Sequence, residues 1–185
     1  MTERALRPAY FRAAEATAVV LNLLYTWLYI RQVPISFLAG ALGSAILVYL
    51  CIIKKLYAES GLQLFYVAMA IRGLMASEGP WQIRHTTLSD HLPWIICGVC
   101  VALLLGFCLD RYTDQKLPYV DAFTATFALI ATWHMVNFVH ENWYYWIAIN
   151  SVSMFMYARR GMWIATVMFA VYLVLSVYGL YAIGL

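Results

Sequence analysis

Three side chains in the segment 141–150 have the types and spacing needed to bind a flat, positively charged ring. Trp143, Trp146 and Asn150 follow one another at intervals of three and four residues, so on a helix they lie on one face. An indole attracts a cation to its face by about 0.5–2 kcal/mol, and a carboxamide can bind a polar edge of the same ligand. An aromatic belt at the membrane interface explains the tryptophans equally well, although it does not explain the asparagine. We predict that all three residues bind substrate.

Gln63 is a fourth candidate, because it lies in an almost wholly apolar segment. A primary amide in hydrocarbon is costly unless it has a partner, so we expect its side chain to face the interior of a helix bundle. There it would either bind the substrate beside the tryptophans or form a hydrogen bond between helices.

No metal site or cofactor is expected. Cys97 and Cys100 form a C-x-x-C pair without a companion pair, whereas structural zinc needs four converging ligands. His134 lies inside an apolar segment and is interpreted as a packing residue. The other histidines lie in or near expected loops and suggest no metal site; they are His85, His91 and His140.

Composition places the chain in a membrane. Of its 185 residues, 64% are hydrophobic and 11% charged, against about 45–50% and about 25% in soluble domains. A helix needs about 20 apolar residues to cross the hydrocarbon core, and helices satisfy their own backbone groups there. We therefore predict an all-α integral membrane protein with seven transmembrane helices, at 13–31, 35–53, 57–75, 92–110, 118–138, 143–158 and 161–183.

The two ends of the chain resemble each other at an offset of 106 residues, from Thr26 to Thr132. The predicted organisation is therefore two parallel three-helix repeats, 13–75 and 118–185, joined by a linker with the fourth helix, 76–117, after an N-terminal segment, 1–12. Substrate sites usually lie where such repeats meet. The residues related by the offset are Thr26-Trp27 and Thr132-Trp133, Ala16 and Ala122, Val33 and Val139, Tyr66 and Tyr172, Gly73-Leu74 and Gly179-Leu180, Glu15 and Asp121, and Lys54 and Arg160.

Basic residues predict the orientation, because Lys and Arg in short loops stay on the cytoplasmic side. Nine of the twelve lie on the face shared by the N-terminus and the even-numbered loops: Arg4, Arg7, Arg12, Lys54, Lys55, Arg111, Lys116, Arg159 and Arg160. Only Arg31, Arg72 and Arg84 lie on the other face. We expect a cytoplasmic N-terminus and an external C-terminus, and the small net charge of +3 indicates topology and not nucleic-acid binding.

The acidic residues favour transport without ion coupling. Glu15, Glu59, Asp110 and Asp121 all lie near the ends of predicted spans, whereas proton-coupled pumps commonly carry a carboxylate at mid-membrane. A membrane enzyme would need a nucleophile and base, or metal ligands, that converge, and no convincing set is present. A structural membrane protein remains an alternative, although it would not need a buried Asn and Gln.

Several motifs resemble the PnuC family of bacterial vitamin transporters. They are Glu-Asn-Trp-x-x-Trp-x-x-x-Asn at 141–150, Leu-Tyr-Ala-x-x-Gly-Leu-Gln-x-Phe-Tyr at 56–66, and Pro-Tyr-x-Asp-Ala at 118–122. The resemblance implies a SWEET-like arrangement of three, one and three helices in the bacterial inner membrane. It also implies facilitated diffusion of an unphosphorylated B-vitamin precursor that contacts Trp143, Trp146, Asn150 and Gln63.

The resemblance is weaker for the choice of vitamin. Nicotinamide riboside carriers of the family typically follow the third span with Tyr-Gly-Trp-x-x-Trp, where this chain has Arg-Gly-Leu-Met-Ala-Ser at 72–77. Its compact build is more similar to members associated with thiamine. Thiamine is therefore marginally favoured, nicotinamide riboside is the alternative, and both are flat cations. Assembly into a homo-oligomer stays open.

Overall fold

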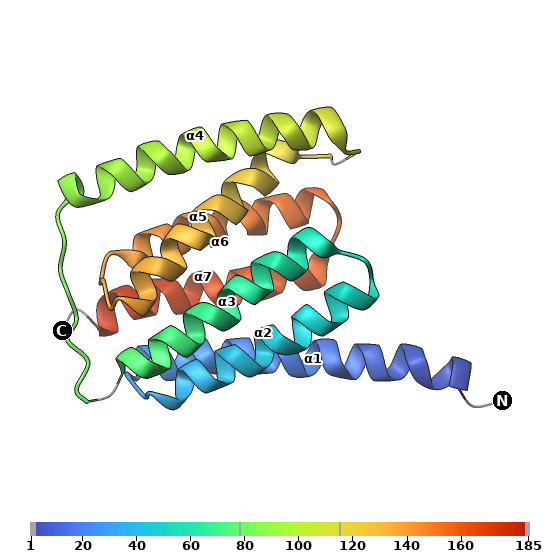
Figure 1. Cartoon of the computed structure of the whole chain (residues 1–185), viewed down its shortest axis with the longest axis horizontal. Coiled ribbons are helices and arrows are strands. Elements are labelled where there is room, and N and C mark those ends of the chain that lie inside the picture. Colours follow the sequence, from blue (N-terminus) through green and yellow to red (C-terminus); the bar gives the residue numbers. More distant parts are fainter. Residues whose placement is uncertain (1–2, 78, 115, 184–185) are drawn as a thin grey trace. The chain divides into compact units, whose positions relative to one another are not determined.

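A computed structural model describes residues 3–77, 79–114 and 116–183 of the chain. These residues form seven α-helices and no strand longer than an isolated bridge between Arg84 and Val139, which confirms the all-α prediction (Figure 1). The helices are α1 Glu3–Ile30, α2 Ile35–Ile53, α3 Tyr57–Ala76, α4 Leu88–Tyr112, α5 Pro118–Val136, α6 Asn142–Arg159 and α7 Trp163–Ala182. Parts of the predicted segments 1–12, 76–117 and 118–185 lie outside the described residues, at 1–2, 78, 115 and 184–185.

Four of the described helices are long and apolar enough to cross a membrane: Tyr10–Ile30 of α1, and all of α2, α4 and α7. The other three carry more polar residues inside their length, including Gln63 on α3, His134 on α5 and Asn150 on α6. Polar groups within a transmembrane bundle mark interior faces and functional sites. Two of the four predicted substrate residues, Gln63 and Asn150, are thus among the polar residues within α3 and α6.

The chain divides into two compact units, residues 1–81 and 82–185. In the first unit α2 packs against both α1 and α3, and the rings of Tyr29, Phe37 and Trp81 meet at 5.0–5.9 Å between centroids. In the second unit α4 packs on α5, α5 on α6, and α6 on α7. Each unit therefore contains three consecutive helices in which the middle helix contacts both neighbours, and the second unit also contains α4.

The turns inside the two units repeat at the offset of 106 residues. After α1, Gln32 has a φ of 55°, and after α5 its counterpart Phe138 has a φ of 56°. After α2, Lys55 has a φ of 58°, and after α6 its counterpart Gly161 has a φ of 71°. This left-handed conformation is strained for residues other than glycine. Its recurrence at corresponding positions, in residues as different as Gln and Phe, shows that the resemblance extends to the backbone.

An ion pair also recurs at the same offset. Arg160 Nη2 lies 2.7 Å from Asp121 Oδ2 in the second unit, and Lys54 Nζ lies 3.7 Å from Glu15 Oε2 in the first. The side chains of Arg160 and Asp121 are each 22% exposed. Those of Lys54 and Glu15 are about half exposed. Lys54 directly follows α2 and pairs with α1, and Arg160 directly follows α6 and pairs with α5. Each pair therefore joins the end of one helix to the helix that precedes it.

Candidate substrate site

Helix α6 presents Trp143 toward α7. The Trp143 side chain is 1% exposed, and a Cβ placed on Gly179 of α7 would lie 2.5 Å from Trp143 Cζ2. Real side chains do not approach so closely, so only glycine allows the indole to lie against the backbone of α7. Trp143 is therefore buried and held in one position, and it does not point outward.

The first unit contains the same arrangement. Phe37 is the counterpart of Trp143 at the offset of 106 residues, and Gly73 is the counterpart of Gly179. A Cβ on Gly73 would clash with the ring of Phe37, which is fully buried. An aromatic ring on a glycine is thus common to both halves, and what distinguishes the second half is the larger, more electron-rich indole.

Asn150 lies two turns further along α6 and is 4% exposed. Its Nδ2 donates a hydrogen bond to Ser176 Oγ of α7 at 3.0 Å. The Ser176 hydroxyl in turn donates to the backbone oxygen of Tyr172 at 2.7 Å. Burying a carboxamide is costly without such partners, so this chain of bonds explains how an asparagine is tolerated inside the bundle.

Trp146 is half-buried on the same side of α6 as Trp143 and Asn150. Its Nε1 is shielded from solvent and has no acceptor among the described residues. A buried donor left without an acceptor costs about 1–3 kcal/mol, and such a group is suited to bind an acceptor on a ligand. The indole N–H of Trp146 is therefore available to a ligand.

Gln63 is half-buried on α3, and its side chain makes no hydrogen bond within the described part of the chain. It belongs to the first unit, whereas Trp143, Trp146 and Asn150 belong to the second. The second unit brings the last three together on α6. That Gln63 joins them in one site stays a prediction.

A polar network that the sequence did not predict lies at the start of α6. Glu141 Oε2 accepts hydrogen bonds from the backbone N–H of Thr86 at 3.0 Å and from its hydroxyl at 2.7 Å. The same hydroxyl lies 2.7 Å from His91 Nε2, and His91 Nδ1 lies 3.0 Å from the Tyr145 hydroxyl. These contacts tie the segment before α4, and α4 itself, to α6.

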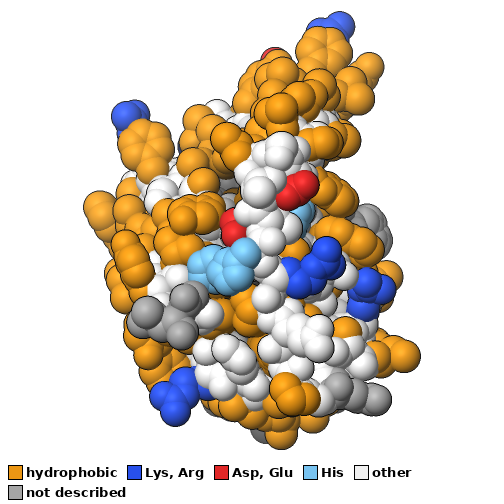
Figure 2. Space-filling model, turned by 90° about the vertical axis from the view of Figure 1, so that its left-hand side faces the viewer, with side chains coloured by type: hydrophobic (Ala, Val, Ile, Leu, Met, Phe, Trp, Pro, Cys, Tyr) orange, Lys and Arg blue, Asp and Glu red, His pale blue; other side chains and the backbone are white. Residues whose placement is uncertain are grey.

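All four histidines of the chain lie around this network. His134 stacks on Tyr145 at 5.4 Å and lies 5.0 Å from His91, ring centroid to ring centroid. His85 Nδ1 is 3.6 Å from Glu141 Oε1, and its ring is 4.9 Å from that of His140. Figure 2 shows histidine side chains gathered beside acidic ones on one end of the molecule. His134 Nδ1 lies 2.8 Å from the backbone oxygen of Ile130, as expected of a packing residue, and its ring also belongs to a cluster drawn from three separate segments.

The loop between α5 and α6 sets the charge of this network. Burial raises the pKa of Glu141, but hydrogen bonds from Thr86 and nearby His140 outweigh it, so the pKa is lowered and the carboxylate is ionised. Burial lowers the pKa of His140, and its neighbour His85 lowers it further. His140 is therefore neutral at pH 7, and acidification adds a proton to it at a cost in stability.

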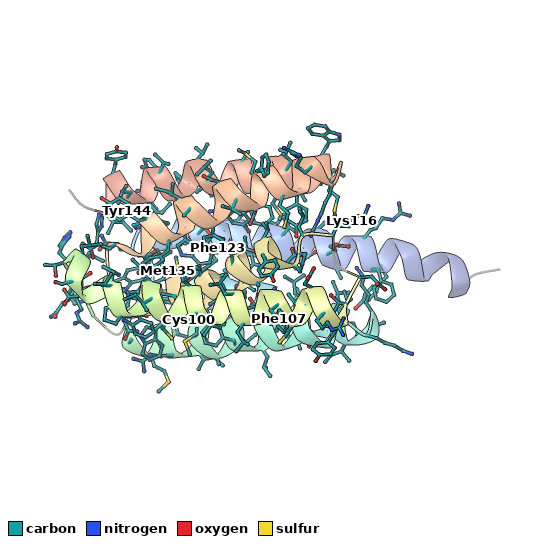
Figure 3. All side chains as sticks on the ribbon, turned by 90° about the horizontal axis from the view of Figure 1, so that it is seen from above. Cys100, Phe107, Lys116, Phe123, Met135 and Tyr144 are labelled. Carbon is teal, nitrogen blue, oxygen red and sulfur yellow. The ribbon has the colours of Figure 1, made fainter. Side chains whose placement is uncertain are left out.

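A cavity of about 520 Å³ opens among α4, α5 and α6. Phe123 of α5 and Tyr144 of α6, both labelled in Figure 3, belong to its lining. Its α6 residues, 144, 145, 148 and 149, lie on roughly the opposite face of the helix from the predicted substrate residues. Its main polar groups, from Thr86, His91, Glu141 and Tyr145, already bind one another, so the cavity offers a ligand an apolar wall and few unused partners.

The seven helices, four of them long and apolar enough to cross a bilayer, define a multi-pass membrane protein. A family model described as "Nicotinamide mononucleotide transporter" matches residues 12–182, which is nearly the whole chain. The chain belongs to this family, and the resemblance to PnuC transporters is confirmed. A solved structure described as "Crystal structure of the Vitamin B3 transporter PnuC" has a similar fold, with a TM-score of 0.72 and 21% sequence identity over 91% of this chain and 79% of that chain.

Proposed function

We propose that this protein carries a nicotinamide-bearing cation, nicotinamide riboside, across the membrane by facilitated diffusion. The observation that supports the proposal is the face of α6 on which Trp143, Trp146 and Asn150 lie together. The two indoles supply electron-rich surfaces for a pyridinium ring, and Asn150 supplies a polar group for its substituent.

The family description favours a vitamin B3 substrate over thiamine, which the sequence marginally favoured. The similar solved structure is that of a vitamin B3 transporter, so the fold relative points the same way. The segment 72–77 remains an argument for thiamine, because it departs from the pattern typical of nicotinamide riboside carriers. Thiamine is therefore the second candidate, and its thiazolium ring would use the same indoles.

The unphosphorylated nucleoside suits α6 and α7 better than the mononucleotide. Neither helix carries Lys or Arg between Asn142 and Ala158 or between Trp163 and Ala182, so neither has a cation there for a phosphate. Phosphate recognition normally relies on Arg, Lys or a helix N-terminus. Nicotinamide riboside carries only the positive ring charge, which the indoles can bind.

Transport would proceed without an ion, with the N-terminus in the cytoplasm and the C-terminus outside. The distribution of basic residues supports this orientation. Asp121 and Glu15, two of the acids near the ends of predicted spans, form ion pairs with basic residues at helix ends. Movement of the repeats about a central site would then expose the substrate alternately to either side.

A binding titration of the purified protein tests the substrate class. The ligands are nicotinamide riboside, nicotinamide mononucleotide, thiamine and riboflavin, the last being flat but uncharged. We expect nicotinamide riboside to bind at least tenfold more tightly than the mononucleotide and riboflavin. Tighter binding of thiamine would establish the second candidate, and preference for riboflavin would overturn the cation-binding proposal. Uptake into vesicles that collapses with the proton gradient would overturn uncoupled transport.

A further inference from the structure

Ser176 donates its hydroxyl proton within its own helix. Its Oγ lies 2.7 Å from the backbone oxygen of Tyr172, one turn earlier on α7. A carbonyl oxygen can only accept, so the single proton of the hydroxyl is donated there. While this bond is kept, Ser176 Oγ can only accept from its other neighbours.

This constraint determines which end of the Asn150 carboxamide faces α7. With the hydroxyl donating to Tyr172, the amide presents its donor to Ser176 Oγ, and Nδ2 lies there at 3.0 Å. A flipped amide would place Oδ1 against Ser176 Oγ, and the hydroxyl could donate to it only by giving up its hydrogen bond to the Tyr172 oxygen. Ser176 is 2% exposed and Asn150 4% exposed, so bulk solvent does not compensate for the wrong orientation.

The Asn150 oxygen is therefore turned away from Ser176. It accepts no hydrogen bond within the described part of the chain. A carbonyl oxygen can accept two hydrogen bonds, so an acceptor is left available on α6, in the same region as Trp146.

We propose that Ser176 is a positioning residue that fixes the Asn150 carboxamide with its oxygen available, so that the site selects ligands whose polar edge carries an N–H donor. The inference deepens the proposed function and rests on Asn150 contacting the substrate. The carboxamide of nicotinamide riboside carries such a donor. The carboxylate analogue, in which oxygen replaces the amide nitrogen, presents only acceptors and would meet the Asn150 oxygen with like polarity.

The first repeat lacks this arrangement. At the offset of 106 residues, Asn150 corresponds to Ser44 and Ser176 to Ala70, which has no hydroxyl. Both counterparts are buried, and α2 and α3 still pack together. Packing of the repeat therefore does not require the Asn–Ser hydrogen bond, which favours a role in ligand selection.

The test compares the affinity of purified protein for nicotinamide riboside with its affinity for the carboxylate analogue. Ser176→Ala removes the constraint on the amide, and Ser176→Thr keeps a hydroxyl that can donate to Tyr172. We expect the affinity ratio of the two ligands to fall about fivefold in Ser176→Ala, which corresponds to about 1 kcal/mol for one hydrogen bond. The ratio in Ser176→Thr should stay within twofold of the wild-type value.

Asn150→Ala separates failure of this inference from failure of the proposed function. If Asn150→Ala weakens binding while Ser176→Ala leaves the ratio unchanged, or lowers both affinities equally, Ser176 does not select the ligand and the proposed function stands. If Asn150→Ala leaves both affinities unchanged, Asn150 does not contact the substrate and both claims about it fail.

A measurement without ligand tests the amide orientation directly. Labelling with ¹⁵N-asparagine marks only four residues, Asn22, Asn137, Asn142 and Asn150, and Asn150→Ala assigns the fourth signal. We expect hydrogen exchange at Asn150 Nδ2 to accelerate at least tenfold in Ser176→Ala and to stay slow in Ser176→Thr. Equal exchange in all three proteins would overturn the proposed orientation.

Discussion

Trp143 lies against Gly179 so closely that a Cβ on the glycine would come within 2.5 Å of the indole. Gly179 determines where the indole can lie, so α7 contributes to the site. The apolar sequence of α7 does not indicate this role. The corresponding contact of Phe37 with Gly73 shows that this packing position belongs to both repeats. The proposed ligand site is thus built from a packing arrangement that the first half uses for its core.

Gly179→Ala should displace the Trp143 ring. The added methyl group must push the indole or separate α6 from α7, and overpacking of this kind costs about 1–3 kcal/mol. We expect a lower melting temperature and at least fivefold weaker binding of nicotinamide riboside, measured by thermal unfolding and calorimetric titration. Gly61→Ala is the matched control, because a Cβ there has no neighbour within 4 Å, and alanine favours a helix. Equal behaviour of the two variants would contradict the packing account.

The two related ion pairs should differ in strength. Asp121 and Arg160 are closer and less exposed than Glu15 and Lys54, so solvent screens them less. Double-mutant cycles to alanine, followed by unfolding free energies in a denaturing-detergent titration, should give a coupling of about 1 kcal/mol for Asp121–Arg160 and under about 0.5 kcal/mol for Glu15–Lys54. A larger coupling for the first-repeat pair would show that burial does not decide between them.

Lys55→Gly should stabilise the turn after α2. Lys55 is exposed and has a φ of 58°, while its counterpart Gly161 occupies the same turn with a φ of 71°. The left-handed conformation costs a side-chain-bearing residue about 1 kcal/mol, so Lys55→Gly should raise the free energy of unfolding by roughly that amount. Gly161→Ala should lower it by a similar amount. If Lys55→Gly instead lowers the free energy of unfolding and Gly161→Ala raises it, flexibility of the unfolded chain outweighs the strain of the turn.

Acidification should destabilise the protein through His140. Because its folded-state pKa is depressed, the unfolded chain binds the proton more tightly, and stability falls as the pH drops below the ordinary histidine value of about 6.5. We expect the melting temperature to fall between pH 7.5 and pH 5.5, and His140→Gln to reduce that fall.

Glu141→Gln is the control for this pH effect. The depressed pKa of Glu141 stabilises the fold above the ordinary value of about 4.3 and is lost only at lower pH, outside this window. The variant should melt lower at pH 7.5, because the charged acceptor for Thr86 is gone, and should keep the fall toward pH 5.5. A pH response that survives His140→Gln and disappears in Glu141→Gln would contradict the assignment.

Periodicity and composition predicted most of the fold. The predicted span 35–53 coincides with α2, and the others agree with their helices except at the ends, where α1 begins at Glu3 and α4 at Leu88. The offset of 106 residues matched Glu15 to Asp121 and Lys54 to Arg160, and the structure adds that each acid forms an ion pair with the base of its own half. These features depend on local sequence or on sparse identities, and both are visible in a single chain.

The partners of the site residues could not be predicted in the same way. A serine in an apolar helix is ordinary, so nothing marked Ser176 as the acceptor for Asn150. The four histidines meet only because the start of α4 lies beside the turn between α5 and α6, where Arg84 pairs with the backbone around Val139. Both kinds of contact join different helices or separate segments of the chain, so they depend on tertiary packing.

The central claim is that the Trp143 indole binds the cationic ring of nicotinamide riboside. Its direct test is a binding titration of purified wild-type protein and Trp143→Ala, with Trp163→Ala as the control because Trp163 is 69% exposed. We predict at least tenfold weaker binding in Trp143→Ala, which corresponds to about 1.4 kcal/mol, and no change in Trp163→Ala. Unchanged affinity in a Trp143→Ala protein that remains folded would contradict the account.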